Sequence, residues 1–568
     1  MSQYDLVIRN GMVVDGSGFA AYRADVGVVG DRIAKIGRIP ERGAEEIDAE
    51  GHVVTPGFID GHTHLDAQSF WDPLGSCSCW HGVTTAVMGN CGFSIAPMRK
   101  GGRELVIRNL ERAEDMSAKA MEQGISWNWE RFTDYMDVVD KLPKGINHAL
   151  NIGHSALRTW AMGERAFTEK ATEDELRLME GEVRAAIQAG AIGFTTSRSR
   201  AHPTVDGSPV ASRLADWSEV QRLVRAVAQA GGGMFEIAND FDIYSSDIPA
   251  RDRVFAQLQD LALETGVPIT FGVTPDNNWR ERMGMVERTN AAGGRMYAQT
   301  HSREVCVLYS FKTRLPFDAL PEWAEIRSLP LDAQRAALTD PVHRTRLANA
   351  AKHSDYSRAP GAGADGHAPD YQWIRVLKDA VELNPTVAEV AEQTGRHPVD
   401  VMIDLALETN FEQFFAQAIA GKNEAGRMEL LRHPLAIMTF SDSGAHVSQI
   451  MDSSIQTHLL AYWVRQREWL TLEEAIRLIT YAPAVAWGFH DRGLLRVGMV
   501  ADLNVIDPAT VAPQLPQVVN DLPGGDRRLV AKSAGIRATV VGGQVFLRDG
   551  EHTGALAGRL LRGDAHVH

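Results

Sequence analysis

The chain has 568 residues, 44% of them hydrophobic and 23% charged, so it is long enough to bury a large core and to form more than one domain. Its formal net charge of −15 disfavours nucleic acid or an anionic membrane surface as a partner, because both require basic patches. There is no run of eighteen apolar residues, the first residues lack a signal-peptide pattern, and four cysteines are too few for a disulfide framework. These features predict a cytoplasmic protein with reduced thiols that acts on a small molecule.

The two ends of the chain have the composition of a β-domain. Near the N-terminus, short strands separated by glycine-rich turns are predicted at residues 4–9, 12–14, 24–29 and 32–36. Strand-like segments also lie near the C-terminus, at residues 501–506 and 536–546. We therefore expect one small β-domain assembled from residues 1–53 and 489–568.

The middle of the chain, residues 54–488, alternates between helix and strand signals. A capping box at Thr172 begins a helix that runs to Gly190, and a strand is predicted at residues 191–196. The same order recurs before predicted strands at residues 234–238, 268–273 and 295–299. Repeated units of this kind predict a parallel α/β architecture, and we expect a (β/α)₈ barrel, its commonest closed form.

One segment interrupts this alternation, at about residues 306–392. It contains charged helical pieces on both sides of a Gly/Ala/Pro-rich loop at residues 359–366. An insertion of this length between barrel units is expected to lie over one end of the barrel, where it can act as a lid.

The strongest chemical signal is an apolar run at residues 53–59 that leads to His62 and His64. Side chains two apart on a strand point the same way, so Asp60 and both histidines would line one side. Imidazole suits zinc and related metals, and a catalytic zinc usually has three protein ligands and one open position. The alternative is a pair of ordinary core or surface histidines, which is the commoner meaning of a His-x-His pair.

Further chemistry-bearing residues follow other predicted strands, where barrel enzymes place their active groups. Cys91 follows the apolar residues 84–88 and is either a thiolate ligand or a small buried hydrophobe. Asp442 ends a late apolar strand, where a metal or a helix cap would explain a carboxylate that is otherwise costly to bury. The remaining candidates at strand ends, for which core roles fit equally well, are His154, Glu236 and His301.

Several motifs occur in order along nearly the whole chain. They are Pro56-Gly57-Phe58-Ile59-Asp60-Gly61-His62-Thr63-His64, Gly82-Val83-Thr84-Thr85, Gly89-Asn90-Cys91-Gly92, Gly153-His154-Ser155-Ala156-Leu157-Arg158, Ser441-Asp442, Gly498-Met499-Val500-Ala501-Asp502-Leu503 and Thr553-Gly554. Together they resemble the amidohydrolase superfamily, specifically its D-aminoacylase or N-acyl-D-amino-acid deacylase branch. The resemblance implies a metal-bearing (β/α)₈ barrel beside a small β-sandwich made from both termini.

The resemblance also implies roles for individual residues. His62 and His64 would be metal ligands on the first strand, and Cys91 would be the thiolate ligand that this branch uses where many relatives use a carboxylated lysine. Asp442 would be both a ligand and the proton shuttle. Asp60 could hold a ligating imidazole in the required tautomer.

One departure from the family pattern concerns the number of metal ions. The branch is expected to supply two more histidines, from the fifth and sixth strands, yet residues 234–238 and 269–273 contain none. Glu236 is the candidate for the first of these places. Of one or two divalent ions, we therefore favour a single Zn²⁺ held by His62, His64 and Asp442, with Cys91 near or bound.

By the same resemblance, the expected reaction is hydrolysis of the amide of an N-acyl-D-amino acid or a related N-acyl compound. A substrate of this kind carries a carboxylate, so an arginine is the natural anchor. The candidates for contact with substrate are Arg158, Arg198, Arg200, His154 and His301. The alternatives are hydrolysis of a cyclic amide or carbamate and a catalytically silent scaffold protein of the same fold. A homo-oligomer is left open.

Overall fold

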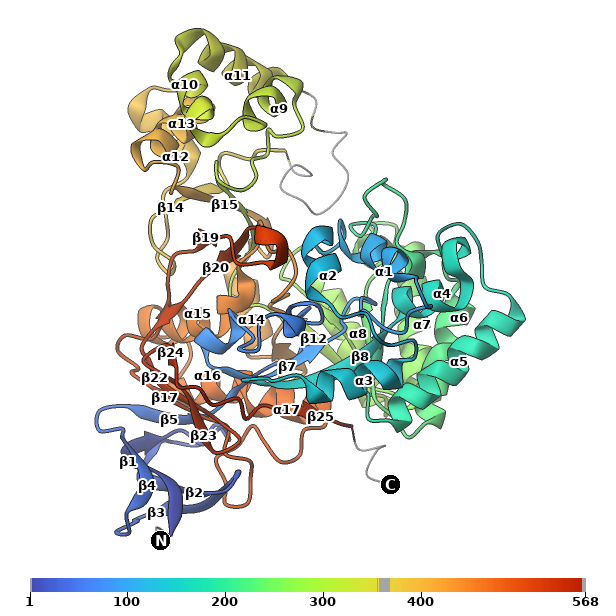
Figure 1. Cartoon of the computed structure of the whole chain (residues 1–568), viewed down its shortest axis with the longest axis vertical. Coiled ribbons are helices and arrows are strands. Elements are labelled where there is room, and N and C mark those ends of the chain that lie inside the picture. Colours follow the sequence, from blue (N-terminus) through green and yellow to red (C-terminus); the bar gives the residue numbers. More distant parts are fainter. Residues whose placement is uncertain (1–2, 355, 357–367, 564–568) are drawn as a thin grey trace.

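A barrel of parallel strands forms the centre of the computed structural model, which describes residues 3–354, 356 and 368–563 (Figure 1). Eight of its strands follow one another around the sheet in chain order. They are β6 (Phe58–Asp60), β7 (Val83–Met88), β8 (Asn147–Gly153), β9 (Gly193–Ser197), β10 (Met234–Ala238), β11 (Ile269–Gly272), β12 (Met296–Thr300) and β16 (Ala436–Met438). The expected (β/α)₈ barrel is confirmed.

The barrel closes through backbone bonds just beyond its first and last strands. The N–H of His64 donates to the carbonyl oxygen of Ser443 at 2.7 Å, and the N–H of Asp442 donates to that of His62 at 3.2 Å. These bonds join the segment after β6 to the segment after β16. The closure therefore brings the ends of the first and eighth strands together.

The barrel strands are largely buried because helices cover their outer face. Every residue of β7 and β8 is buried, as expected for a parallel sheet covered on both faces. The capping box at Thr172 begins α5 (Glu173–Gln188), and Glu175 Oε2 accepts the N–H of Thr172 at 2.8 Å. The next helices of the outer ring are α6 (Trp217–Gln229), α7 (Ile248–Thr265) and α8 (Trp279–Ala291).

Both ends of the chain contribute to one sheet at the lower left of Figure 1. The N-terminal strands are β1 (Tyr4–Val13), β2 (Tyr22–Val29), β3 (Arg32–Gly37), β4 (Gly43–Asp48) and β5 (Val53–Pro56). They join β17 (Leu503–Ile506), β22 (Ile536–Val541), β23 (Gln544–Arg548) and β24 (Glu551–His552), with β5 and β17 antiparallel. The buried carboxylate of Asp502 fixes this sheet to the barrel, because it accepts bonds from Arg492 at 2.6 Å and from Asn147 of β8 at 2.9 Å.

The inserted unit is a separate body at the top of Figure 1, between β12 and the last barrel strand. It contains β13 (Val305–Tyr309), α9 (Pro321–Arg327), α10 (Leu331–Thr339), α11 (Pro341–His353), β14 (Ile374–Leu377), α12 (Val387–Thr394), α13 (Pro398–Glu408) and β15 (Phe414–Ala420). Its end lies at Ala420 instead of about Glu392, because α13 and β15 pack into the same hydrophobic core as α9. The loop at residues 359–366, expected to form part of a lid, lies outside the described residues.

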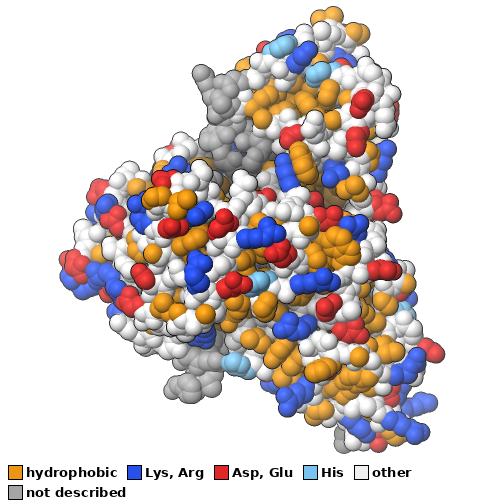
Figure 2. Space-filling model, turned by 180° about the vertical axis from the view of Figure 1, so that it is seen from behind, with side chains coloured by type: hydrophobic (Ala, Val, Ile, Leu, Met, Phe, Trp, Pro, Cys, Tyr) orange, Lys and Arg blue, Asp and Glu red, His pale blue; other side chains and the backbone are white. Residues whose placement is uncertain are grey.

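The surface carries both signs of charge. Figure 2 shows the inserted unit projecting from the body of the molecule, with basic and acidic side chains interspersed over that face. In the ranges that the structure describes, none of the helices combines the length and the apolar character needed to cross a membrane.

Candidate metal centre

Three side chains converge at the C-terminal ends of the first two barrel strands. His62 and His64 follow β6, and Cys91 follows β7. One ligand atom from each lies within 4.8 Å of the others, and all three residues are buried. The Cys91 Sγ atom is 3.4 Å from His62 Nε2. The strand ends thus bring together the residues that the sequence singled out.

Asp442 approaches the same histidines from the segment after β16. Its Oδ1 atom is 3.2 Å from His62 Nε2 and 3.5 Å from His64 Nε2, and it is buried with no hydrogen-bond partner among the described residues. The backbone of Asp442 and of Cys91 is left-handed, with φ of 50° and 53°. Such conformations cost about 1–3 kcal/mol for non-glycine residues and are enriched at functional sites.

Glu236 reaches this cluster from β10, the fifth barrel strand. Its Oε2 atom accepts the N–H of Cys91 at 2.7 Å, and its Oε1 atom is 4.0 Å from Cys91 Sγ. Burial raises the pKa of Glu236 to about 7 and raises the pKa of the Cys91 thiol well above its usual value. Glu236 therefore holds the loop that carries Cys91 and lies beside the sulfur.

The His62 ring is oriented by Gln299 of β12. His62 Nδ1 lies 2.8 Å from Gln299 Oε1, and the bond with Nδ1–H as donor leaves Nε2 free to bind a metal. Asp60, expected to hold an imidazole, instead accepts the backbone N–H of His62 at 3.2 Å and the hydroxyl of Thr439 at 3.0 Å. The orienting bond is thus made by an amide that the sequence did not indicate.

Replacement of Gln299 by leucine is expected to weaken metal binding about 10- to 100-fold, because partners that orient a ligating histidine contribute this much. Competition with a chromophoric chelator measures the affinity. Gln299→Glu keeps an acceptor at the same place and is expected to retain tight binding. An unchanged affinity in the leucine variant would show that Gln299 does not orient the ligand.

Glu114 and His446 complete the cluster, and the sequence analysis missed both. Glu114 lies in the turn after α1 (Arg103–Leu110) and is 1% exposed. Its Oε2 atom is 3.6 Å from His64 Nε2 and 3.5 Å from His446 Nε2. No strand precedes Glu114, so no pattern marked it, whereas His446 lies four residues after Asp442 and could have been found from that position.

The burial of these acidic groups fits a bound cation. Burial and the nearby carboxylates of Asp442 and Glu236 raise the pKa of Glu114 well above its usual value. Within 4 Å, the basic partners of Asp442 and Glu114 in the described part of the chain are all histidines. Both nitrogens of His64, one oxygen of Glu114 and Oδ1 of Asp442 are buried without a hydrogen-bond partner. A divalent metal ion would satisfy these atoms and offset the negative charge.

Comparison with known families identifies the chain. Residues 45–303 and 338–546 match the model of the Amidohydrolase family. The chain belongs to the amidohydrolase family. It is 27% identical to a D-aminoacylase of Alcaligenes xylosoxydans xylosoxydans over 98% of this chain and 97% of that protein. It is 29% identical to an N-acyl-D-glutamate deacylase of the same organism over 99% of this chain and 97% of that protein.

Solved structures show the same fold. An N-acyl-D-glutamate deacylase from Bordetella bronchiseptica, complexed with zinc and a phosphonate inhibitor, superimposes with a TM-score of 0.64 at 23% identity, over 99% of this chain and 100% of that one. A D-aminoacylase with a binuclear metal center superimposes with a TM-score of 0.65 at 23% identity, over 98% of this chain and 100% of that one. The family membership makes this chain a hydrolase of amide C–N bonds.

Two of the residues expected to bind substrate in this amidohydrolase instead form buried contacts between two helices. Arg158 in α4 (His154–Met162) is fully buried, and its Nη1 atom donates to both carboxylate oxygens of Glu219 at 2.6 Å. His154 Nε2 is 2.9 Å from the same carboxylate. Both side chains therefore link α4 to α6 and are not available to anchor a substrate in this arrangement.

The other residues expected to contact substrate differ in where they lie relative to the metal cluster. His301 follows β12, is 3% exposed and has no hydrogen-bond partner on either nitrogen among the described residues. Its ring lies 5.0 Å from the Phe440 ring, which lies 4.2 Å from the His62 ring. His301 is therefore at the edge of the metal cluster, whereas Arg200 is exposed in the loop after β9 and Arg198 donates to the carbonyl oxygen of Ala215.

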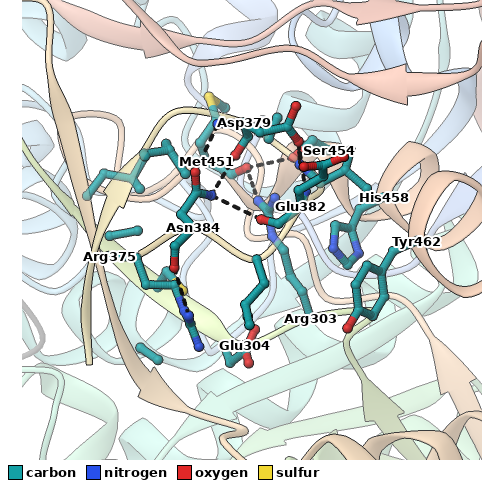
Figure 3. A pocket seen from close by; sticks show the side chains of 18 of the residues that line it. Arg303, Glu304, Arg375, Asp379, Glu382, Asn384, Met451, Ser454, His458 and Tyr462 are labelled. Atoms are coloured by element: carbon teal, nitrogen blue, oxygen red, sulfur yellow. Dashed lines mark hydrogen bonds between the residues drawn. The ribbon is translucent and has the colours of Figure 1, made fainter. Parts of the chain in front are cut away.

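A cavity of about 260 Å³ lies between the barrel and the inserted unit of the amidohydrolase (Figure 3). Its lining includes Arg303 after β12, Arg375 of β14 and the segment Met451–Asp452. Arg303 is fixed by Asp452, with Nη2 to Oδ1 at 3.0 Å. Met451 and Asp452 also line a smaller cavity, and Asp442 lines that cavity as well. The larger cavity is thus adjacent to the metal cluster.

Proposed function

We propose that this amidohydrolase uses zinc to hydrolyse the amide of an N-acyl-D-amino acid, releasing the free amino acid and the acyl carboxylate. The observation that carries the proposal is the convergence of the buried His62, His64 and Cys91 at the barrel end, with Asp442 beside both histidines. The choice of substrate is supported by the similarity to D-aminoacylase and N-acyl-D-glutamate deacylase over nearly the full length of the chain.

The proposed metal ligands are the nitrogens of His62 and His64, the Cys91 sulfur and a carboxylate oxygen of Asp442, with Glu236 beside them. Nitrogen, sulfur and carboxylate donors of this kind suit zinc. A zinc ion bound there would supply Lewis-acid activation of water and of the substrate carbonyl.

Asp442 is the proposed proton carrier. Burial opposes ionisation of Asp442, but the imidazoles of His62 and His64 beside it hold its pKa well below its usual value, so the carboxylate is ionised at neutral pH. In the proposed reaction it takes a proton from the attacking water and passes it to the nitrogen of the departing amine. The carboxylate then returns to its starting form, as a general base that becomes a general acid requires.

The proposed substrate site extends from Asp442 into the cavity under the inserted unit. Arg375 lines this cavity, with Nη1 donating to the carbonyl oxygen of Asn384 at 3.1 Å. A guanidinium can form two parallel bonds to a carboxylate. We therefore favour Arg375 over Arg158 as the anchor for the substrate carboxylate, since Arg158 is held by Glu219.

The proposed reaction predicts release of free amine from N-acyl-D-amino acids, with little release from the L-enantiomers. The purified protein would be stripped of metal with a chelator, reloaded with zinc, cobalt or manganese, and assayed against paired D- and L-substrates. Activity is expected to disappear on chelation and to return with metal.

The controls separate the alternatives. If the protein hydrolysed only cyclic amides or carbamates, the proposed substrate class would be wrong. The protein would still be a metal-dependent hydrolase. Absence of turnover on any substrate, together with the absence of tightly held transition metal, would instead favour a catalytically silent protein of the same fold.

A further inference from the structure

Two side chains that line the cavity under the inserted unit have hydrogen-bonding atoms that remain unpaired in the described part of the chain. They are His458, through Nε2, and Arg427, through Nε. We infer that this pair binds a carboxamide, so that the preferred substrates are N-acyl derivatives of D-glutamine or D-asparagine. The inference rests on the proposed hydrolysis and names the side chain of its substrate. The pair is separate from Arg375, the proposed anchor for the substrate carboxylate, which belongs to β14 of the inserted unit.

The acceptor character of His458 follows from its contact with Ser302. The hydroxyl of Ser302 donates its single proton to the carbonyl oxygen of Ile455 at 2.8 Å. Ser302 Oγ must therefore accept at its second contact, which is His458 Nδ1 at 3.1 Å. With the proton on Nδ1, the neutral ring presents a lone pair at Nε2. Burial and the nearby guanidinium groups of Arg303 and Arg427 lower the pKa of His458 well below its usual value, so the ring stays neutral.

The ring of His458 is also held in place by its neighbours. His458 ends α15 (Ile455–His458), and its ring stacks on that of Tyr462, with the centroids 5.3 Å apart (Figure 3). The Tyr462 hydroxyl in turn donates to Glu424 at 2.6 Å. Tyr462 lies in the π-helix Leu459–Gln466, a rare conformation that is frequent at functional sites. Because Nδ1 is bonded to Ser302, Nε2 is the nitrogen available to a ligand in the cavity.

Arg427 supplies the donor. It belongs to α14 (Glu424–Leu431) and is 2% exposed. Its Nη2 atom donates to the carbonyl oxygen of Gly421 and is 3.9 Å from the carboxylate of Glu304. Its Nε atom is buried and has no hydrogen-bond partner among the described residues. A buried guanidinium with an unused N–H is unfavourable, and an oxygen atom of a ligand in the cavity would offset this.

A carboxamide matches both groups, whereas other side chains match one or neither. Its oxygen would accept from Arg427, and its NH₂ group would donate to His458 Nε2. A carboxylate has no proton to donate, so one of its oxygens would face the His458 lone pair. A cationic side chain would be repelled by Arg303 and Arg427. An apolar side chain would leave both polar groups unpaired, and a site built for hydrogen bonds discriminates strongly against such a substrate.

A comparison of three substrates of similar size tests the inference. N-acetyl-D-glutamine, N-acetyl-D-glutamate and N-acetyl-D-methionine are assayed with the zinc-loaded protein. The kcat/KM for the glutamine derivative is expected to exceed that for each of the others by about tenfold or more, the effect of one well-formed hydrogen bond. Calorimetric titration with the three free D-amino acids needs no turnover and is expected to show the tightest binding for D-glutamine.

Two variants test the role of His458. His458→Phe keeps a ring next to Tyr462 but removes Nε2, so the preference for D-glutamine over D-methionine should fall about tenfold. Ser302→Ala removes the acceptor that holds the proton on Nδ1, so the tautomer with the proton on Nε2 becomes available and D-glutamate should gain on D-glutamine. His552→Phe is the matched control, because His552 also contacts an aromatic ring, that of Phe546, but lies in β24 of the terminal sheet. It should change neither ratio.

The outcomes separate this inference from the proposed function. Equal or better use of the D-glutamate or D-methionine derivative by wild type would overturn the carboxamide site, as would an unchanged ratio in His458→Phe. If that variant does not fold, an unchanged ratio in Ser302→Ala has the same meaning. Tighter binding of D-glutamine without hydrolysis of any N-acyl-D-amino acid would contradict the proposed function and leave the carboxamide site standing. Hydrolysis without a preference for D-glutamine would do the reverse.

Discussion

Asp442→Asn is expected to lower kcat for amide hydrolysis by about 10²- to 10⁴-fold, the range attributed to a positioned acid–base group. Asparagine has nearly the same shape, so the fold should persist, but its amide cannot accept the proton of water at neutral pH. The carboxylate is held ionised by His62 and His64, and the variant removes that negative charge. Steady-state kinetics on the best N-acyl substrate, with circular dichroism of the same sample, measures both effects.

Two controls distinguish proton transfer from loss of metal. Metal content is measured for each variant, and the assay is repeated with excess zinc, which should not restore the rate. Asp240→Asn is the matched aspartate variant, because Asp240 lies in the loop after β10 and its nearest cationic partner is Arg198 at 3.8 Å. It should keep wild-type activity. An Asp442→Asn enzyme with more than about a tenth of the wild-type rate would exclude Asp442 as the proton carrier.

The sequence predicts the part of the site that depends on strand ends. His62, His64, Cys91 and Asp442 each directly follow an apolar strand, and parallel strands bring their carboxyl ends to one rim. The apolar strand pattern and the barrel architecture were therefore enough to predict that these four side chains lie close together. The split β-sheet was also foreseeable, because strand-like composition occurs at both ends of the chain.

The remaining contacts join segments that are far apart in the sequence, and no local sequence pattern predicts them. Glu114 meets His446 across 332 positions of sequence, from a turn with no strand before it. Arg158 was a candidate anchor because it follows a predicted strand, but its partner Glu219 comes from a different helix, 61 residues later. The inserted unit extends to Ala420 because packing within its own core, rather than composition, sets its boundary.

Arg158→Met is expected to lower the free energy of unfolding by about 3–5 kcal/mol, the usual cost of removing one partner from a buried ion pair. Arg158 is fully buried and bonds both oxygens of Glu219, so methionine would fill part of the space but leave that carboxylate without its main partner. Equilibrium denaturation in urea measures the change. The KM of the folded variant should be unchanged, because the guanidinium joins α4 to α6 and does not line the cavity beside Asp442.

The double variant Arg158→Met with Glu219→Gln provides the control. It removes the buried charge together with its partner, so it should recover a large part of the lost stability, and the difference from the single variants gives the coupling energy. Glu219 also contacts His154 Nε2, so recovery should be incomplete. If Arg158 instead anchors the substrate carboxylate, Arg158→Met would raise KM strongly with little loss of stability. The ratio of these two effects therefore separates a structural ion pair from a substrate contact.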